Sequence, residues 1–360
     1  MKSRNRLTAS SLEAFLPTEP SQMEFLSLLS VKSLSQLART NTFSHAFFKP
    51  ALDTHAAKQL LTYVLQGNAV KAKEMYTANP GLLFIEAEAM EWASGFEKET
   101  DDPVRRGVQL SPLRAMAAAG DQWMLKDALD VLANYIDKET RQLGSSLAGE
   151  QIKQHFPNGF DYPPSTYDFS PLITTITNDQ QLIQTGNPSD ATAAFIEKFR
   201  KNFMPGVVKS GYLFNLNELI KALELYDQNN RPWHANQRKF FWCQVVGYLE
   251  RLVPSVFAQA LSQGIANVVE GNPLQRALSF RNYVINKDVS FFPLDTDLAC
   301  RLGLVFGVDS YYAAVAGRLP ALWVTAGRAP YAAFIELMSS NSNELGKIYA
   351  TATARSSLNK

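Results

Sequence analysis

Two helix–turn–helix units, each reversed at a glycine that precedes Asn or Asp, are the feature that most limits how this chain can fold. In the first unit, leucines and valines at helical spacing lead to Gly67, and a second amphipathic helix follows and stops before Pro80. In the second unit, Pro112 opens a helix that ends at Gly120, and a further apolar stripe follows. Glycine supplies the left-handed backbone angle that so tight a reversal needs. Because neither unit can bury its apolar face alone, the pattern predicts a short array of helical repeats.

The segment between the two units predicts an extended hairpin. Glu and Ala alternate after residue 82, an acidic turn follows and ends at Pro103, and Arg105 and Arg106 open the second arm. The alternation is too weak to fix the register of the two arms. We expect the acidic residues to form a solvated face, with a docking strip for a basic partner as the alternative. These residues are Glu86, Glu88, Glu91, Glu97 and Glu99.

The rest of the chain predicts a mainly helical fold. Proline and aromatic residues are dense at 156–171, which predicts an ordered loop held by its rings. Amphipathic patterns then continue to about residue 261, short strands are expected near 278–284 and 290–292, and a last helix is expected at 331–338. The polar tail beyond it, rich in Ser, Thr, Ala and Asn, is expected to be mobile.

Charge and hydropathy exclude two classes of partner. Lys and Arg number 35 against 34 Asp and Glu, a formal net charge of +1, so the sequence has no basic field for nucleic acid. The longest apolar stretches, such as 312–316 and 240–248, fall far short of the roughly 20 residues that cross a bilayer. The sequence therefore predicts no nucleic-acid partner and no membrane span, and the N-terminus shows no signal peptide for export.

The residues that could carry chemistry form no strong motif. The four histidines lack the i, i+4 spacing of a helical metal site, so we expect no metal and no cofactor. Cys243 with His234 and Asp227 could form a thiolate nucleophile and its base, but the aromatic neighbours of Cys243 favour core packing. Asp295 and Asp297 lie in a turn where helix capping is the simpler role. The remaining candidates have structural interpretations. Cys300 is interpreted as a buried thiol, and Gly303, Gly307 and Gly317 are interpreted as turns.

Residues 16–48 carry a Leu-Pro-x-Glu opening, a leucine, serine and lysine core, and a following helix with bulky residues. This segment resembles the F-box, a small trihelical module that docks on a Skp-type adaptor of cullin ubiquitin ligases. One extra residue separates Glu19 from the core, and Pro20 stands where the family has an aliphatic residue. The alternative is a plain three-helix cap that seals the first repeat. The resemblance implies protein-binding residues at Leu16, Pro17, Leu26, Leu29 and Leu34.

The two helix–turn–helix units are similar to divergent ankyrin repeats. The match runs through Gly67, Pro80 and the stretch from Ser111 to Arg114, which stands in place of the Thr-Pro-Leu-His signature. With the aromatic loop at 154–169, the chain looks like a group of ankyrin-type Dot/Icm effectors of Legionella. This resemblance implies a bacterial protein translocated into the host cytoplasm, where its partners are host proteins.

These observations together predict an interaction protein with four parts. They are an F-box-like cap at 1–50, divergent ankyrin-like repeats with a hairpin insertion at 51–185, a helical C-terminal domain with a few short strands at 186–340, and a mobile tail with a translocation signal at 341–360. The predicted function is a protein-interaction scaffold, and the F-box resemblance implies that it recruits a host target to a cullin ubiquitin ligase. Two alternatives stay open: an enzyme with a site in the C-terminal third, and a structural binding partner with no link to ubiquitin.

Overall fold

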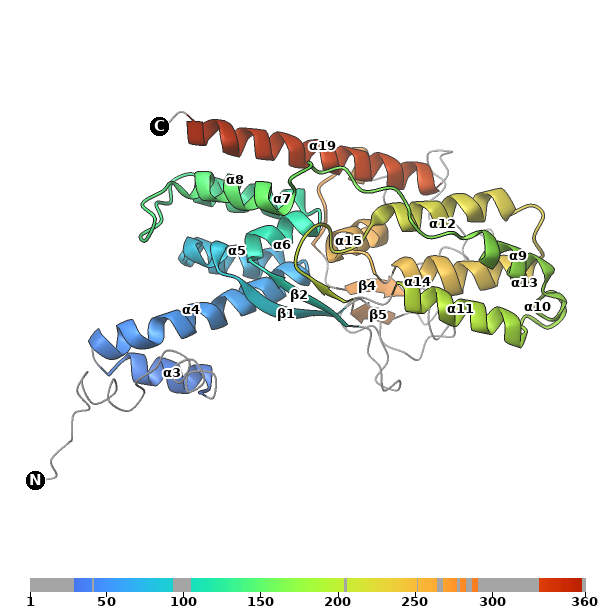
Figure 1. Ribbon diagram of the computed structural model, residues 1–360, viewed down its shortest axis with the longest axis horizontal. Helices are drawn as coiled ribbons and strands as arrows, with labels where there is room; N and C mark the ends of the chain where they lie inside the picture. The colour runs from blue at the N-terminus through green and yellow to red at the C-terminus, as the bar shows by residue number, and fades with distance from the viewer. Residues whose placement is uncertain are drawn as a thin grey trace, which may run out of the picture.

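The computed structural model shows a mainly helical molecule with a small sheet. It describes residues 29–40, 42–92, 105–203, 206–250, 252–263, 268–276, 279–282, 287–290 and 330–357. Figure 1 places the first helices at one end of the molecule and helices α9 (Ser170–Asn178) to α13 (Ala235–Phe241) at the other, with the last helix running along one side of both halves. The mainly helical class predicted from the sequence is confirmed.

Most elements are helices, and the short strands lie between them along the chain. In the first half they are α3 (Val31–Ala38), α4 (Thr42–Leu65), α5 (Ala69–Ala78), the 3-10 turn η1 (Pro80–Phe84), β1 (Ala87–Trp92), β2 (Arg105–Leu110), α6 (Pro112–Ala118), α7 (Gln122–Leu132) and α8 (Gly144–His155). In the second half they are α9 (Ser170–Asn178), α10 (Gln180–Thr185), α11 (Asp190–Asn202), β3 (Val207–Val208), α12 (Leu216–Asn229), α13 (Ala235–Phe241), the π-helical segment η2 (Trp242–Val246), α14 (Gly247–Glu250), α15 (Ser255–Gln263), β4 (Ser279–Asn282), β5 (Lys287–Ser290) and α19 (Pro330–Ser357).

Both predicted helix–turn–helix units are present. Gly67 and Gly120 take positive φ angles of 66° and 70° at the two reversals. The next residue then caps the following helix: the side chain of Asn68 accepts from the amide of Lys71, and that of Asp121 accepts from the amide of Met124 at 2.9 Å. Helix α4 packs on α6 and α5 packs on α7, so the units stack side by side. Their assignment as ankyrin repeats stays a prediction.

The predicted hairpin is confirmed, and the structure supplies its register. Strands β1 and β2 are antiparallel, with Ala87 opposite Leu110 and Trp92 opposite Arg105. The short β3 pairs in parallel with β2, so the order of the sheet is β1-β2-β3. The acidic turn that ends at Pro103 lies outside the described residues. Within β1, side chains alternate between the core and the exposed face.

One of the acidic residues expected on a solvated face is buried. Glu91 is 4% exposed and forms an ion pair of 3.1 Å with Arg106, its cross-strand neighbour. Arg106 also donates to the carbonyl of Leu252 at 2.6 Å, which anchors the hairpin to the second half of the chain. Glu86 and Glu88 are exposed as predicted, and Glu97 and Glu99 lie outside the described residues. The prediction was wrong for Glu91 because a cross-strand arginine compensates its burial.

The aromatic loop predicted at 156–171 bridges two hydrophobic cores. Phe156 and Phe160 pack in the core of the repeats, whereas Tyr162 and Phe169 pack in the core of the second half. Buried Glu218 of α12 holds the loop by accepting from the amide of Thr166 at 2.7 Å and from the hydroxyl of Ser165 at 2.6 Å. The change of core therefore falls within this loop, earlier than the boundary expected after residue 185, and α9 and α10 belong to the second core.

The C-terminal tail differs most from its prediction. Helix α19 does not end near Met338 but continues to Ser357, through most of the segment expected to be mobile. Phe334 and Leu337 pack in the second core, Leu345 is fully buried in the first, and α19 contacts α7, α8 and α12. Burial on two cores orders a helix whose composition alone favours a mobile tail. The strands expected near 278–284 and 290–292 are present as the hairpin β4–β5, over somewhat different bounds.

Candidate functional site

The residues predicted to bind a partner gather at the N-terminal end, where α3 packs on the first half of α4. Leu34 is fully buried in a small cluster with Ala38 and Phe48, and Leu29 is half-buried at its edge. Leu16, Pro17 and Leu26 lie outside the described residues. The side chain of Ser30 starts α3 by accepting from the amide of Ser33 at 3.1 Å. Within this cluster Leu34 stabilises the module, and adaptor binding by any of the five residues stays a prediction.

Helix α4 joins this N-terminal module to the repeats. Its first half belongs to the small cluster through Phe48, and its second half enters the core of the repeats through Leu60, Leu61 and Val64. Pro50 lies between the two halves, where its ring removes one helical hydrogen bond. Because the helix continues through Pro50, the module is attached by secondary structure and not by a flexible linker.

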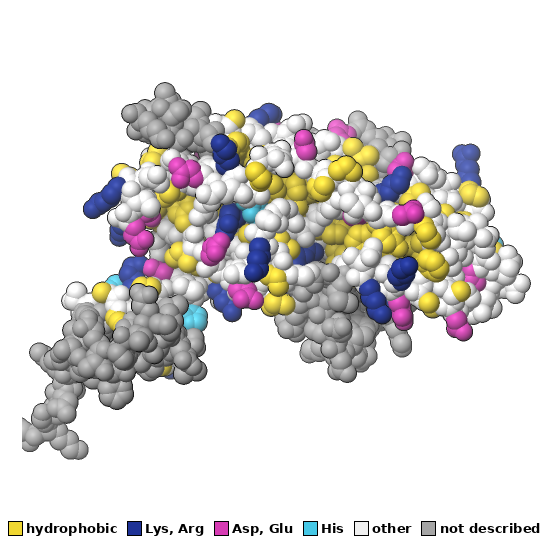
Figure 2. Space-filling view, viewed as in Figure 1, with side chains coloured by type: hydrophobic (Ala, Val, Ile, Leu, Met, Phe, Trp, Pro, Cys, Tyr) yellow, Lys and Arg dark blue, Asp and Glu magenta, His cyan; other side chains and the backbone are white. Residues whose placement is uncertain are grey.

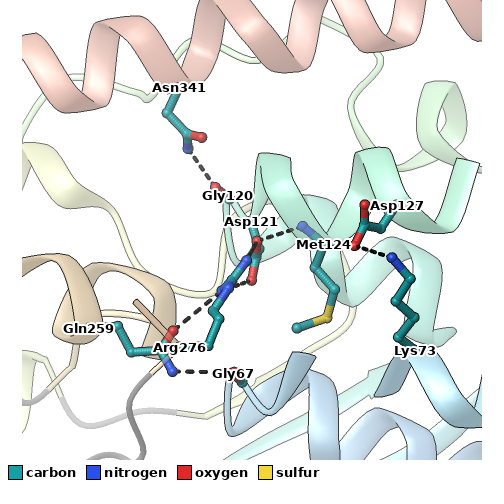
Figure 3. Close-up of polar contacts among 9 residues, drawn as sticks. All are labelled: Gly67, Lys73, Gly120, Asp121, Met124, Asp127, Gln259, Arg276 and Asn341. Atoms are coloured by element: carbon teal, nitrogen blue, oxygen red, sulfur yellow. Dashed lines mark hydrogen bonds and ion pairs between the residues drawn. The ribbon is translucent and has the colours of Figure 1, made fainter. Parts of the chain in front are cut away.

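The tips of both helix–turn–helix units are closed by side chains from the second half of the chain (Figure 3). Gln259 of α15 donates to the carbonyl of Gly67 at 3.2 Å, and Asn341 of α19 donates to the carbonyl of Gly120 at 2.7 Å. Gln259 and Asn341 are each 1% exposed. These turn tips, which a repeat array can offer to a partner, are thus occupied by the chain itself.

An ion pair between Asp121 and Arg276 lies at the centre of this closure. The two guanidinium nitrogens of Arg276 donate to the two carboxylate oxygens of Asp121 at 2.7 and 2.5 Å, a bidentate arrangement. The guanidinium also lies 5.8 Å from the centre of the Trp123 ring. Asp121 was identified from the sequence only as a turn residue. Nothing in the local sequence around Arg276 indicates its partner, which lies 155 residues away.

A pocket of about 380 Å³ lies beside this ion pair, between α7, residues 268–273 and α19. Its lining is mixed: Trp123, Val268 and Leu337 are apolar, Lys126 is basic, and Glu344 is acidic and pairs with Lys347. In the part of the chain that the structure describes, no group of three His, Cys, Asp or Glu side chains could hold a metal ion.

The thiol, base and acid considered from the sequence lie in different surroundings. Cys243 is buried in η2, in agreement with its interpretation as a core residue. His234 is exposed and caps α13, where its Nδ1 accepts from the amide of Asn236. Asp227 is exposed near the end of α12. Asp295, Asp297, Cys300 and the three glycines at 303, 307 and 317 lie outside the described residues.

Two buried titratable groups have strongly shifted pKa values. Burial lowers the pKa of His155 to about 4, although its Nε2 lies 2.8 Å from the carbonyl of Gly211. Burial raises the pKa of the Glu250 carboxyl to about 8. Neither group lines the pocket beside Arg276.

Charge on the visible face in Figure 2 is balanced, since Lys and Arg side chains are interspersed with Asp and Glu. Among the described helices, none is both long and apolar enough to cross a bilayer. No protein-family model, curated protein or solved structure shows a significant match to this chain.

Proposed function

We propose that this protein is an interaction scaffold whose N-terminal module docks on a partner and whose repeats hold a second protein. In its specific form, the partner is a Skp-type adaptor of a cullin ubiquitin ligase and the second protein is a host target. The chain would then be a bacterial effector acting in the host cytoplasm, as its resemblance to ankyrin-type effectors implies. Any ubiquitin transfer would belong to the recruited ligase.

The observation that carries the proposal is the division of α4 between two cores. A scaffold that presents one protein to another needs a fixed spacing between its two binding surfaces. Helix α4 meets this need because Phe48 packs in the module and Leu60 and Leu61 pack in the repeats.

The proposal is tested by capture of host proteins on the purified full chain, followed by mass spectrometry. The test variant carries Leu16→Ala, Pro17→Ala and Leu29→Ala, and the matched control carries Val70→Ala on α5, a side chain that is 66% exposed. We expect adaptor and cullin peptides with the wild-type chain and the control, and their loss with the triple variant. Folded wild-type protein that retains no adaptor would overturn the ubiquitin link and leave only a scaffold.

A further inference from the structure

The exposed face of the small sheet carries an apolar row that crosses all three strands. Met90 of β1 lies opposite Gly107 of β2, and Gly107 pairs in turn with Val207 of β3. Met90 is 43% exposed and Val207 is 56% exposed, two of the few large apolar side chains on the described surface. A Cβ at Gly107 would lie 3.1 Å from the Val207 side chain, so Val207 covers the glycine on this face. Met90 and Val207 therefore lie on either side of Gly107.

Strand β1 is also the outermost strand of its sheet. Its backbone pairs with β2, and within the described chain it forms no backbone hydrogen bond with any other segment. Alternate residues of an edge strand direct their N–H and C=O groups away from the sheet, where a further strand can pair with them. The edge and the apolar row meet at Met90.

Charge selects the occupant of this edge. Glu88 lies two residues before Met90, so both side chains are on the exposed face. A second copy of this chain would bring its own Glu88 to the same edge, and like charges across a strand pair are unfavourable. A basic side chain opposite Glu88 would instead form a favourable pair.

From these observations we infer that β1 binds an extended segment of a partner protein as an added strand. On the face shared with β1, that segment carries a basic side chain opposite Glu88 and an apolar side chain, two residues away, opposite Met90. The backbone edge supplies the hydrogen bonds, and the two side chains supply the specificity. The inference rests on the proposed scaffold function and assigns a surface to the second protein.

The test uses a synthetic ten-residue peptide as the probe. It has blocked ends, a Thr and Val frame, and Arg and Ile two positions apart, and fluorescence anisotropy measures its binding to the full chain. We expect saturable binding that falls about tenfold with Glu88→Lys, because a favourable charge pair becomes a repulsive one. Glu150→Lys on α8, an equal charge change at another exposed residue, should bind like wild type. A peptide with Glu in place of Arg should recover binding to Glu88→Lys.

Hydrogen exchange on the same samples locates the site. We expect the peptide to slow amide exchange within 87–92 of the full chain and not in α3 or α4. The inference is overturned if the peptide does not bind up to about 1 mM, a level at which even weak strand addition is detected. It is also overturned if wild type and Glu88→Lys bind equally well, or if exchange in β1 is unchanged. Adaptor capture by Glu88→Lys should equal that of wild type, so failure here is distinct from failure of N-terminal docking.

Discussion

The two sides of the helix–turn–helix units differ in how far the rest of the chain covers them. On the turn side, Gln259 and Asn341 from the second half of the chain donate to the carbonyls of Gly67 and Gly120, and Arg276 pairs with Asp121. On the sheet side, Met90 and Val207 are exposed. Long-range polar contacts thus close one surface of the repeats and leave the other exposed. If this is right, substitutions on the turn side should lower stability, and those on the sheet side should affect binding alone.

The largest effect is expected from Asp121→Ala on the turn side. The change removes the cap of α7 and leaves the guanidinium of Arg276 largely buried without its carboxylate partner. We expect a loss of about 3 kcal/mol or more in the free energy of unfolding, measured by urea denaturation. The matched control is Asp127→Ala, which removes an exposed pair with Lys73 and should cost less than about 1 kcal/mol. Equal effects of the two changes would contradict a closed turn side.

The next contrast in stability compares Gly120 on the turn side with Gly107 on the sheet side. Gly120 has a φ of +70°, and an added Cβ would lie 2.8 Å from Asn341 and 2.9 Å from the Tyr162 hydroxyl. We expect Gly120→Ala to lower the free energy of unfolding by about 2 kcal/mol through backbone strain and crowding. Gly107→Ala on the sheet should change it by less than about 1 kcal/mol, since only the exposed Val207 must move. Thermal denaturation of both variants tests the contrast, which fails if Gly107→Ala is the more harmful.

The third prediction concerns the loop that follows β3, which His155 holds through Gly211. Because the folded-state pKa of His155, about 4, is below its ordinary value of 6.5, the unfolded chain binds the proton first as pH falls. This group's contribution to stability is therefore complete above pH 6.5 and is lost between pH 6.5 and about 4. We expect that loss to be about 3 kcal/mol, measured by denaturation at a series of pH values. His155→Gln should remove this part of the pH dependence, and a variant with an unchanged profile would refute the assignment.

The smallest effect is expected from Met90→Ser on the sheet side. An exposed side chain outside any core should change the free energy of unfolding by no more than about 0.5 kcal/mol. The same change should weaken binding of the Arg and Ile peptide, because it removes the apolar partner of Ile. A large loss of stability would show that Met90 is part of the fold and not of a binding surface.

Local signals predicted much of the fold. The two reversals at Gly67 and Gly120 followed from apolar periodicity and turn chemistry, and the hairpin followed from two arms around a proline turn. The burial of Glu91 could not be predicted, because it depends on Arg106 and on the carbonyl of Leu252 from a distant segment. Such contacts leave no periodic signal in the sequence.

The same limit applies to the tail and to the candidate site. In α19, Phe334, Leu337, Leu345 and Ile348 lie on one face, but Asn341 occupies the centre of that face and interrupts its apolar pattern. Only the carbonyl of Gly120, 221 residues away, explains a buried asparagine there. The row from Met90 to Val207 was equally hidden, since it depends on the pairing of β3 with β2.

Hydrogen exchange of the full chain with and without a purified Skp-type adaptor tests the central claim most directly. The scaffold account predicts slower exchange confined to residues 16–38, with α5 to α8 unchanged because the repeats remain available for the second protein. Unchanged exchange throughout the chain at saturating adaptor, or protection within α5 to α8 instead of the N-terminal module, would contradict the account.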